Sequence, residues 1–179
     1  MNIVLTGLRG SGKTRIGIII SQHLGWNFID TDKEIEKEEG KTIKEIIELN
    51  GWGYFREKER NMAEKTAKLD KTIVATGGGL IIDKKNKEAL KKNGKIIYLH
   101  EKPEICAYRI LNSKNRQNRP PLTDKESVEE EMKHLYEQRN GSYRESADIV
   151  FDRTDNKEQD AIKIIGILFC NIFCHFFGF

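Results

Sequence analysis

The sequence predicts an α/β fold built on a doubly wound, five-stranded parallel sheet flanked by helices. Five short apolar runs alternate with longer stretches of helical periodicity. Within each run the apolar residues are continuous, which is typical of strands that are buried on both faces of a parallel sheet. The chain has 179 residues, 37% of them hydrophobic and 33% charged, which indicates one domain with a proper core.

The order of the elements follows from these runs. The predicted strands are residues 3–5, 27–29, 72–75, 95–99 and 148–151. The predicted helices are residues 13–24, 32–40, 42–50, 54–69, 83–92, 103–111 and 125–143, and a last helix starts near Asn156. Residues 112–124 are polar and basic, contain proline and have no periodicity. They predict either a solvent loop or a mobile lid over phosphates.

Charge and cysteine content restrict the partners and the compartment. Thirty-one Lys and Arg against 28 Asp and Glu give a formal net charge of +3, which is too small an excess to argue for nucleic acid. The three cysteines have no CxxC spacing, so reduced thiols in the cytoplasm are expected. The N-terminus lacks the basic region of a signal peptide. We therefore expect a cytoplasmic monomer with no membrane or nucleic-acid partner.

Residues 7–14, GLRGSGKT, form a phosphate-binding loop. They fit G-x-x-x-x-G-K-[ST], follow a predicted strand and open a predicted helix. Glycines let the backbone aim N–H groups at phosphates, and the helix N-terminus adds partial positive charge. Lys13 would reach the β- and γ-phosphates, and the Thr14 hydroxyl would be a ligand of Mg²⁺. The predicted nucleotide-binding residues of the loop are Gly10, Ser11, Gly12, Lys13 and Thr14.

Further polar and glycine-rich segments follow the second and third predicted strands. Asp30 and Asp32 are two residues apart, so in an extended segment both carboxylates would face the crevice at the carboxyl edge of the sheet. Alternatively, Asp32 caps the next helix. The run TGGG at 76–79 predicts either a close approach of a ligand to the backbone or a flexible turn. Arg56 and Arg139, each taken alone, are typical of surface residues.

The order of these segments resembles the shikimate kinase family. The sequence has GLRGSGKT, DTD at 30–32, YFREKE at 54–59, ATGGGL at 75–80, NRPPL at 118–122 and QRNGSYRESAD at 138–148. The resemblance covers about residues 1–165. It implies a P-loop kinase domain at 1–168 with a substrate-binding helical region at 32–60, a lid at 112–124 and an atypical apolar tail at 169–179. It also implies transfer of the γ-phosphoryl of ATP to the 3-hydroxyl of shikimate, in aromatic amino acid biosynthesis.

The resemblance also implies roles on the acceptor side. Asp30, with Thr14, would help to hold one Mg²⁺ per ATP, and Asp32 would bind the substrate hydroxyls and accept the reacting proton. Paired guanidinium groups suit a planar carboxylate, so Arg56 and Arg139 would bind that of shikimate. The remaining implied contacts are the backbone N–H groups of Gly77, Gly78 and Gly79 with the substrate, and Glu59, which would orient Arg56.

On the donor side, the resemblance assigns Arg119 to the phosphates, as the catalytic arginine of the lid beside Lys13 and Asp32. The lid here is longer than usual and has Arg-Pro-Pro-Leu in place of Arg-Pro-Leu-Leu, so Arg116 is an alternative contact. Arg109 would stack on adenine, and the segment that begins at Arg153 would close the other side of the base. Ile47 would stand where the family often has a phenylalanine in the pocket wall.

Other interpretations remain open. A gluconate kinase would share the phosphate loop, but should lack the DTD, FR and GGG segments in this order. A nucleoside monophosphate kinase is disfavoured because no second base pocket is apparent in the sequence. A catalytically silent nucleotide-binding module would be expected to lose Asp30, Asp32 or Arg139, and all three are present.

Overall fold

The computed structural model describes the backbone of residues 1–113 and 122–176 and the side chains of residues 1–113 and 122–169. Its five strands form one parallel sheet in the order β2-β3-β1-β4-β5. The strands are β1 (Asn2–Thr6), β2 (Asn27–Asp30), β3 (Thr72–Ala75), β4 (Gly94–His100) and β5 (Ile149–Asp152). The predicted fold class, strand count and strand direction are confirmed.

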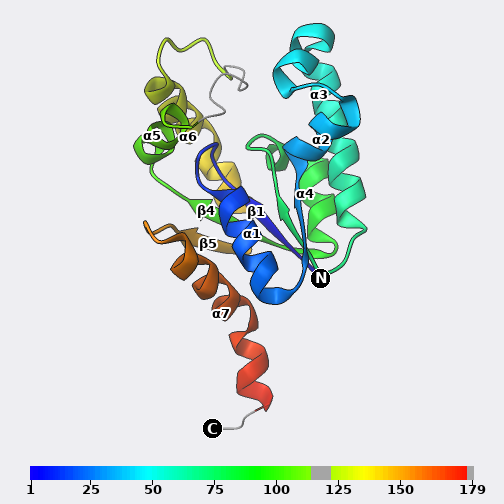
Figure 1. Ribbon diagram of the computed structural model, residues 1–179, viewed down its shortest axis with the longest axis vertical. Helices are drawn as coiled ribbons and strands as arrows, with labels where there is room; N and C mark the ends of the chain where they lie inside the picture. The colour runs from blue at the N-terminus through cyan, green and yellow to red at the C-terminus, as the bar shows by residue number, and fades with distance from the viewer. Residues whose placement is uncertain (114–121, 177–179) are drawn as a thin grey trace.

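Helices cover both faces of this sheet (Figure 1). They are α1 (Lys13–Leu24), α2 (Thr31–Glu39), α3 (Ile43–Ala67), α4 (Lys84–Lys91), α5 (Pro103–Leu111), α6 (Val128–Ser146) and α7 (Lys157–Phe176), with the 3₁₀ turn η1 (Leu80–Ile82) after β3. Alternate residues of β1 face opposite sides. Val4 packs with residues of α4, α5 and α6, whereas Ile3 and Leu5 pack with residues of α1 and α7. The sheet is therefore doubly wound.

A third, smaller cluster joins α2 to α3 beside the sheet. Ile35 of α2 packs against Ile46, Phe55 and Met62 of α3. Helix α3 replaces the two predicted helices at 42–50 and 54–69, and it is broken at Gly51, where φ is 78° and ψ is 170°. The predicted interruption is thus present as a kink, and this helical pair stands at one end of the sheet (Figure 1).

Helix α7 runs past the edge of the sheet toward the C-terminus (Figure 1). Its first turns pack on the sheet through Ala161 and Ile164. Phe169 belongs to the same cluster and makes an edge-to-face contact with Trp26 at a centroid distance of 6.1 Å. Within the described residues, every helix is too short or too polar to cross a membrane.

Candidate active site

The phosphate-binding loop at 7–12 joins β1 to α1 and is tightly packed from outside. Gly10 and Gly12 have positive φ angles of 85° and 95°, a conformation that side chains disfavour. A Cβ at Gly10 would lie 2.7 Å from the carbonyl oxygen of Cys106, and one at Gly12 would collide with the guanidinium of Arg153. Glycine is therefore required at both positions for conformation and for space.

Lys13 and Thr14 begin α1 at the mouth of this loop. The buried Lys13 Nζ donates to the carbonyl oxygens of Gly7 at 2.9 Å and Leu8 at 2.7 Å. The Thr14 hydroxyl donates to Asp30 Oδ2 at 2.7 Å. A hydroxyl and a carboxylate in contact at the start of α1 are the hard oxygen donors that Mg²⁺ prefers, so the residues present fit the predicted metal site.

The two aspartates occupy different elements, which corrects one expectation from the sequence. Asp30 ends β2 and is the N-cap of α2, accepting from the Lys33 N–H at 3.4 Å. Asp32 lies in the first helical turn. The pair therefore does not sit in one extended segment, and Asp32 is not the cap. Both nevertheless line the same cleft, because α2 starts at the carboxyl edge of the sheet.

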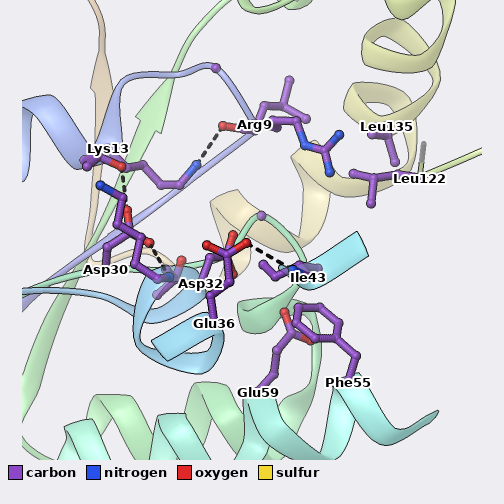
Figure 2. Close-up of a pocket in the computed structure, with 18 of the residues that line it drawn as sticks. Arg9, Lys13, Asp30, Asp32, Glu36, Ile43, Phe55, Glu59, Leu122 and Leu135 are labelled. Carbon is purple, nitrogen blue, oxygen red and sulfur yellow. Dashed lines mark hydrogen bonds between the residues drawn. The ribbon is translucent and has the colours of Figure 1, made fainter. Parts of the chain in front are cut away.

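The Asp32 carboxyl lies in the cleft among other charged side chains (Figure 2). Its Oδ1 is buried and accepts no hydrogen bond from the described residues. Burial first, then the charges of Asp30 and Glu59, raise the pKa of Asp32 from 3.8 to about 7. The cations Lys13 and Arg9 act in the opposite direction. This carboxyl can therefore exchange a proton near neutral pH.

Arg56 is oriented by contacts with a buried carboxylate and with two aromatic rings. It forms an ion pair and a hydrogen bond with Glu59, one turn later in α3. Burial raises the pKa of Glu59, and the charge of Arg56 opposes that rise. The guanidinium lies 5.2 Å from the Trp52 ring centroid and 5.7 Å from that of Phe55. A Cβ at Gly79 would lie 2.6 Å from Arg56 Nη1, so glycine there leaves room for this arginine.

The glycine run after β3 is fixed in place by two neighbouring elements. Arg139 Nη1 donates to the Gly78 carbonyl oxygen at 3.4 Å, and the hydroxyl of the buried Tyr143 donates to it at 2.5 Å. The Gly77 N–H donates to the Thr31 hydroxyl at 2.9 Å. The run is therefore an ordered turn, and Arg139 of α6 lies beside it.

These groups line a cleft of about 300 Å³ at the carboxyl edge of the sheet (Figure 2). Its polar and charged lining includes Lys13, Thr14, Asp30, Asp32, Arg56, Glu59, Arg139 and the glycine run, and its apolar lining includes Ile43, Trp52, Phe55, Leu122 and Leu135. Ile47, predicted to stand in the wall, instead packs against the cluster between α2 and α3. The wall of the cleft is instead formed by Ile43, one helical turn earlier in α3, and by Trp52 and Phe55 after the kink.

A second cleft, of about 780 Å³, lies on the other side of the loop. Tyr108, Arg109, Asn112, Ser113, Arg153, Asp155 and Lys157 line it together with residues of the loop. Gly10, Lys13 and Thr14 line both clefts, so the two meet at the loop. The predicted donor residues Arg109 and Arg153 are thus brought together, whereas Arg116 and Arg119 lie outside the described residues.

One set of contacts near the first cleft could not be predicted from the sequence. The buried Glu131 of α6 accepts from the Leu122 N–H at 3.1 Å and lies 3.7 Å from the guanidinium of Arg9. It thereby ties the end of the predicted lid to the phosphate-binding loop. A single glutamate in a charged helix has no spacing or motif that would distinguish it, and Arg9 occupies a variable position of the loop motif.

The parallel sheet, the phosphate-binding loop and the two clefts that meet at Lys13 and Thr14 are the architecture of a small P-loop kinase. The shikimate kinase family model matches residues 9–168. The chain belongs to the shikimate kinase family.

Individual relatives agree with this assignment over nearly the whole chain. The shikimate kinase of Caldanaerobacter subterraneus subsp. tengcongensis is 41% identical over 162 residues, which cover 90% of this chain and 92% of that protein. Shikimate kinase 2 of Yersinia enterocolitica is 37% identical, with coverage of 93% and 94%. The structure of shikimate kinase from Acinetobacter baumannii in complex with shikimate superposes with a TM-score of 0.88 at 33% identity, covering 95% of this chain and 93% of that one.

Proposed function

We propose that the protein transfers the γ-phosphoryl of ATP to the 3-hydroxyl of shikimate, giving shikimate 3-phosphate and ADP. The observation that carries this proposal is the meeting of two clefts at Lys13 and Thr14, one of them lined by paired arginines and a buried carboxyl. Family membership supports ATP as the donor and shikimate as the acceptor. We also propose a cytoplasmic monomer built as one domain over residues 1–168.

The acceptor cleft suits a small ring that carries one carboxylate and several hydroxyls. Arg56 and Arg139 enter it from α3 and α6 and would bind the carboxylate, since guanidinium forks match its planar geometry. The apolar side chains of Trp52 and Phe55 would cover the ring. Asp32 would bind the hydroxyls at the end nearest the loop, and the glycine run would allow the ring to approach the backbone.

Phosphoryl transfer requires the acceptor oxygen to be aligned with the γ-phosphorus. The 3-hydroxyl oxygen forms the new bond to that phosphorus, the bond to the β–γ bridging oxygen breaks, and ADP leaves with the electron pair. The hydroxyl proton passes to Asp32, whose raised pKa of about 7 suits it to exchange a proton near neutral pH. In a loose transition state, positioning by Asp32 contributes more than proton removal.

Lys13 would neutralise charge on the β- and γ-phosphates, and the loop N–H groups would hold the phosphate oxygens. Thr14 and Asp30 would hold Mg²⁺, which when bound would supply positive charge against the developing charge of the phosphates. Arg109 would face the adenine from α5. The predicted lid, with Arg119 or Arg116, would close over the phosphates from the segment between α5 and α6.

The proposal is tested by ADP release, coupled to NADH oxidation, with ATP, Mg²⁺ and a panel of shikimate, quinate, gluconate and AMP. Shikimate should stimulate ADP release far more than the other three compounds. Stimulation by gluconate alone would favour the sugar-acid kinase alternative, and stimulation by AMP would favour a nucleoside monophosphate kinase. ATP binding without stimulation by any acceptor would indicate a catalytically silent module.

A further inference from the structure

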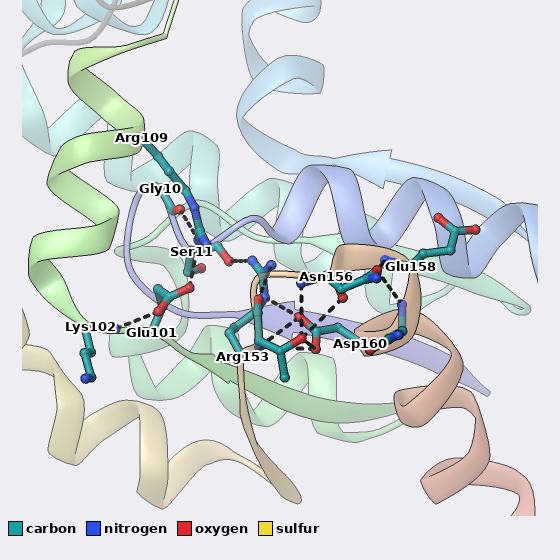
Figure 3. Close-up of polar contacts among 11 residues, drawn as sticks. Gly10, Ser11, Glu101, Lys102, Arg109, Arg153, Asn156, Glu158 and Asp160 are labelled. Carbon is teal, nitrogen blue, oxygen red and sulfur yellow. Dashed lines mark hydrogen bonds and ion pairs between the residues drawn. The ribbon is translucent and has the colours of Figure 1, made fainter.

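A buried ion pair lies beside the phosphate-binding loop, and its arginine also lines the second cleft (Figure 3). Arg153 follows β5, and Asp160 lies in the first turns of α7. Arg153 Nε lies 2.9 Å from Asp160 Oδ2, and the two side chains are 4% and 0% exposed. A buried pair of this kind is costly to form, and neither of its residues lines the acceptor cleft.

The guanidinium of Arg153 reaches from this pair to the loop. Its Nη1 donates to the carbonyl oxygen of Ser11, and its Nη2 donates to the carbonyl oxygen of Thr154 at 3.3 Å. In a trans peptide the C=O and N–H groups point in opposite directions. The contact that holds the Ser11 carbonyl outward therefore turns the N–H of Gly12 toward the other side of the loop, where phosphates are expected.

Asp160 holds the guanidinium in this position. Besides Arg153, its carboxylate accepts from the Thr154 N–H at 3.2 Å and from the Thr154 hydroxyl at 2.7 Å. These contacts fix the orientation of the Asp160 carboxylate. Gly12 completes the fit, because any side chain there would occupy the space of Arg153 Nη1. The pair and the loop are thus matched to each other.

A similar contact supports the loop from α5. The buried Glu101 lies 2.8 Å from Arg109, and Arg109 Nη1 donates to the Gly10 carbonyl oxygen at 3.4 Å. Two consecutive loop carbonyls, of Gly10 and Ser11, are therefore each held by an arginine that is itself held by a buried carboxylate (Figure 3). Of the two arginines, Arg153 is the more completely enclosed.

We propose that Asp160 is a positioning residue of the nucleotide site: it fixes Arg153 against the Ser11 carbonyl and so presets the loop N–H groups for the phosphates. Arg153 then acts through the loop backbone, from outside, and not by covering the base. This inference deepens the proposed function and rests on it. N–H donors that already point at the phosphate position need no reorganisation when the phosphates bind. A buried carboxylate that lies away from the phosphates can therefore raise the affinity for ATP.

The test measures binding of ATP and of inorganic tripolyphosphate, each with Mg²⁺, by titration calorimetry. The variants are Asp160→Asn, Arg153→Gln and the double variant. The matched control is Glu158→Gln, an exposed carboxylate in the same helical turn that pairs with His23 at 3.4 Å. Steady-state KM values for ATP and shikimate are measured in parallel. If Asp160→Asn does not fold, Arg153→Lys replaces it, because lysine keeps the charge and loses the fork.

We expect each single variant to weaken the binding of ATP and of tripolyphosphate by a similar factor of about tenfold. This is the effect expected for the loss of a hydrogen bond to a charged group. The double variant should bind ATP no more weakly than Arg153→Gln does, because both substitutions act through the same contact with the Ser11 carbonyl. The KM for shikimate should stay within about twofold, as it should in the control.

Two results would overturn the inference. The first is weaker ATP binding with unchanged tripolyphosphate binding, which would show that Arg153 contacts the adenine base. The second is a loss of equal size in the affinities for ATP and for shikimate. Absence of ATP binding by the wild-type protein would instead contradict the proposed function.

Discussion

Replacing Asp32 with asparagine should stabilise the folded protein at pH 8, although it removes the group that we expect to accept the reacting proton. The Asp32 carboxyl has a pKa raised to about 7, chiefly by burial, and its Oδ1 has no hydrogen-bond partner among the described residues. Between pH 4 and 7 the folded state therefore binds more protons at this position than the unfolded state does. Stability that Asp32 contributes in acid is lost as the pH rises through that window.

The size of the effect follows from the shift. A rise from 3.8 to about 7 corresponds to about 4 kcal/mol at full value above pH 7, at 1.36 kcal/mol for each pKa unit. At pH 5 the same shift has cost only about 1.5 kcal/mol, because the folded-state carboxyl is still protonated. Because residue Asp32 is partly exposed although its Oδ1 is buried, we expect about half of these values, and so a difference of about 1 kcal/mol or more between pH 5 and pH 8.

Urea unfolding of the wild type and of Asp32→Asn at pH 5 and pH 8 measures this difference. The matched control is Glu145→Gln, an exposed carboxylate on α6. The variant should gain stability over the wild type at pH 8 and less at pH 5, and kcat should fall by about 100-fold or more. A gain that does not depend on pH, or a loss of stability at pH 8, would refute the reasoning.

The remaining predictions concern the two substrates, the metal and the tail. Arg139→Ala should raise the KM for shikimate by about tenfold or more and the KM for ATP by less than about threefold; steady-state kinetics with equal losses for both would contradict the carboxylate role. The value of kcat/KM for shikimate should rise tenfold per pH unit toward about pH 7 and then level off, because Asp32 must be ionised; a flat profile from pH 5 to 8 would argue against it. Thr14→Val should raise the Mg²⁺ concentration needed for half-maximal activity, while Thr14→Ser should not; equal Mg²⁺ requirements would remove Thr14 from the metal site. Phe169→Ala should lower stability by about 1–2 kcal/mol through loss of the Trp26 contact, while activity at 25 °C stays nearly unchanged; an unchanged free energy of unfolding in urea would contradict this packing.

The strands, the loop and most helices could be predicted because their signals are local. Continuous apolar runs mark strands buried on both faces, and GLRGSGKT carries its own conformational requirements. The break in α3 was also predictable, since Gly51 and Gly53 interrupt the helical pattern. Boundaries shifted where a cap intervened: α6 begins at Val128, because the Ser127 side chain accepts from the Glu130 N–H.

The features that could not be predicted depend on a local change of backbone direction or on residues far apart in the chain. The sequence places Asp30 and Asp32 close together, but only the turn into α2 decides that Asp30 is the cap. Glu131 meets Leu122 and Arg9 through the packing of α6 beside the loop. These side chains share no spacing, and their roles appear only when the sheet order brings their elements together.

We propose that ATP and shikimate bind in the two adjacent clefts and that the γ-phosphoryl passes from one to the other. The most direct measurement is ¹H–³¹P correlation NMR of the product formed from ATP, Mg²⁺ and shikimate by the wild-type protein. We expect one new phosphomonoester signal that correlates with the ring proton at C3, and an equal amount of ADP. A phosphoryl group on another hydroxyl, or ADP formed without any phosphorylated ring, would contradict it.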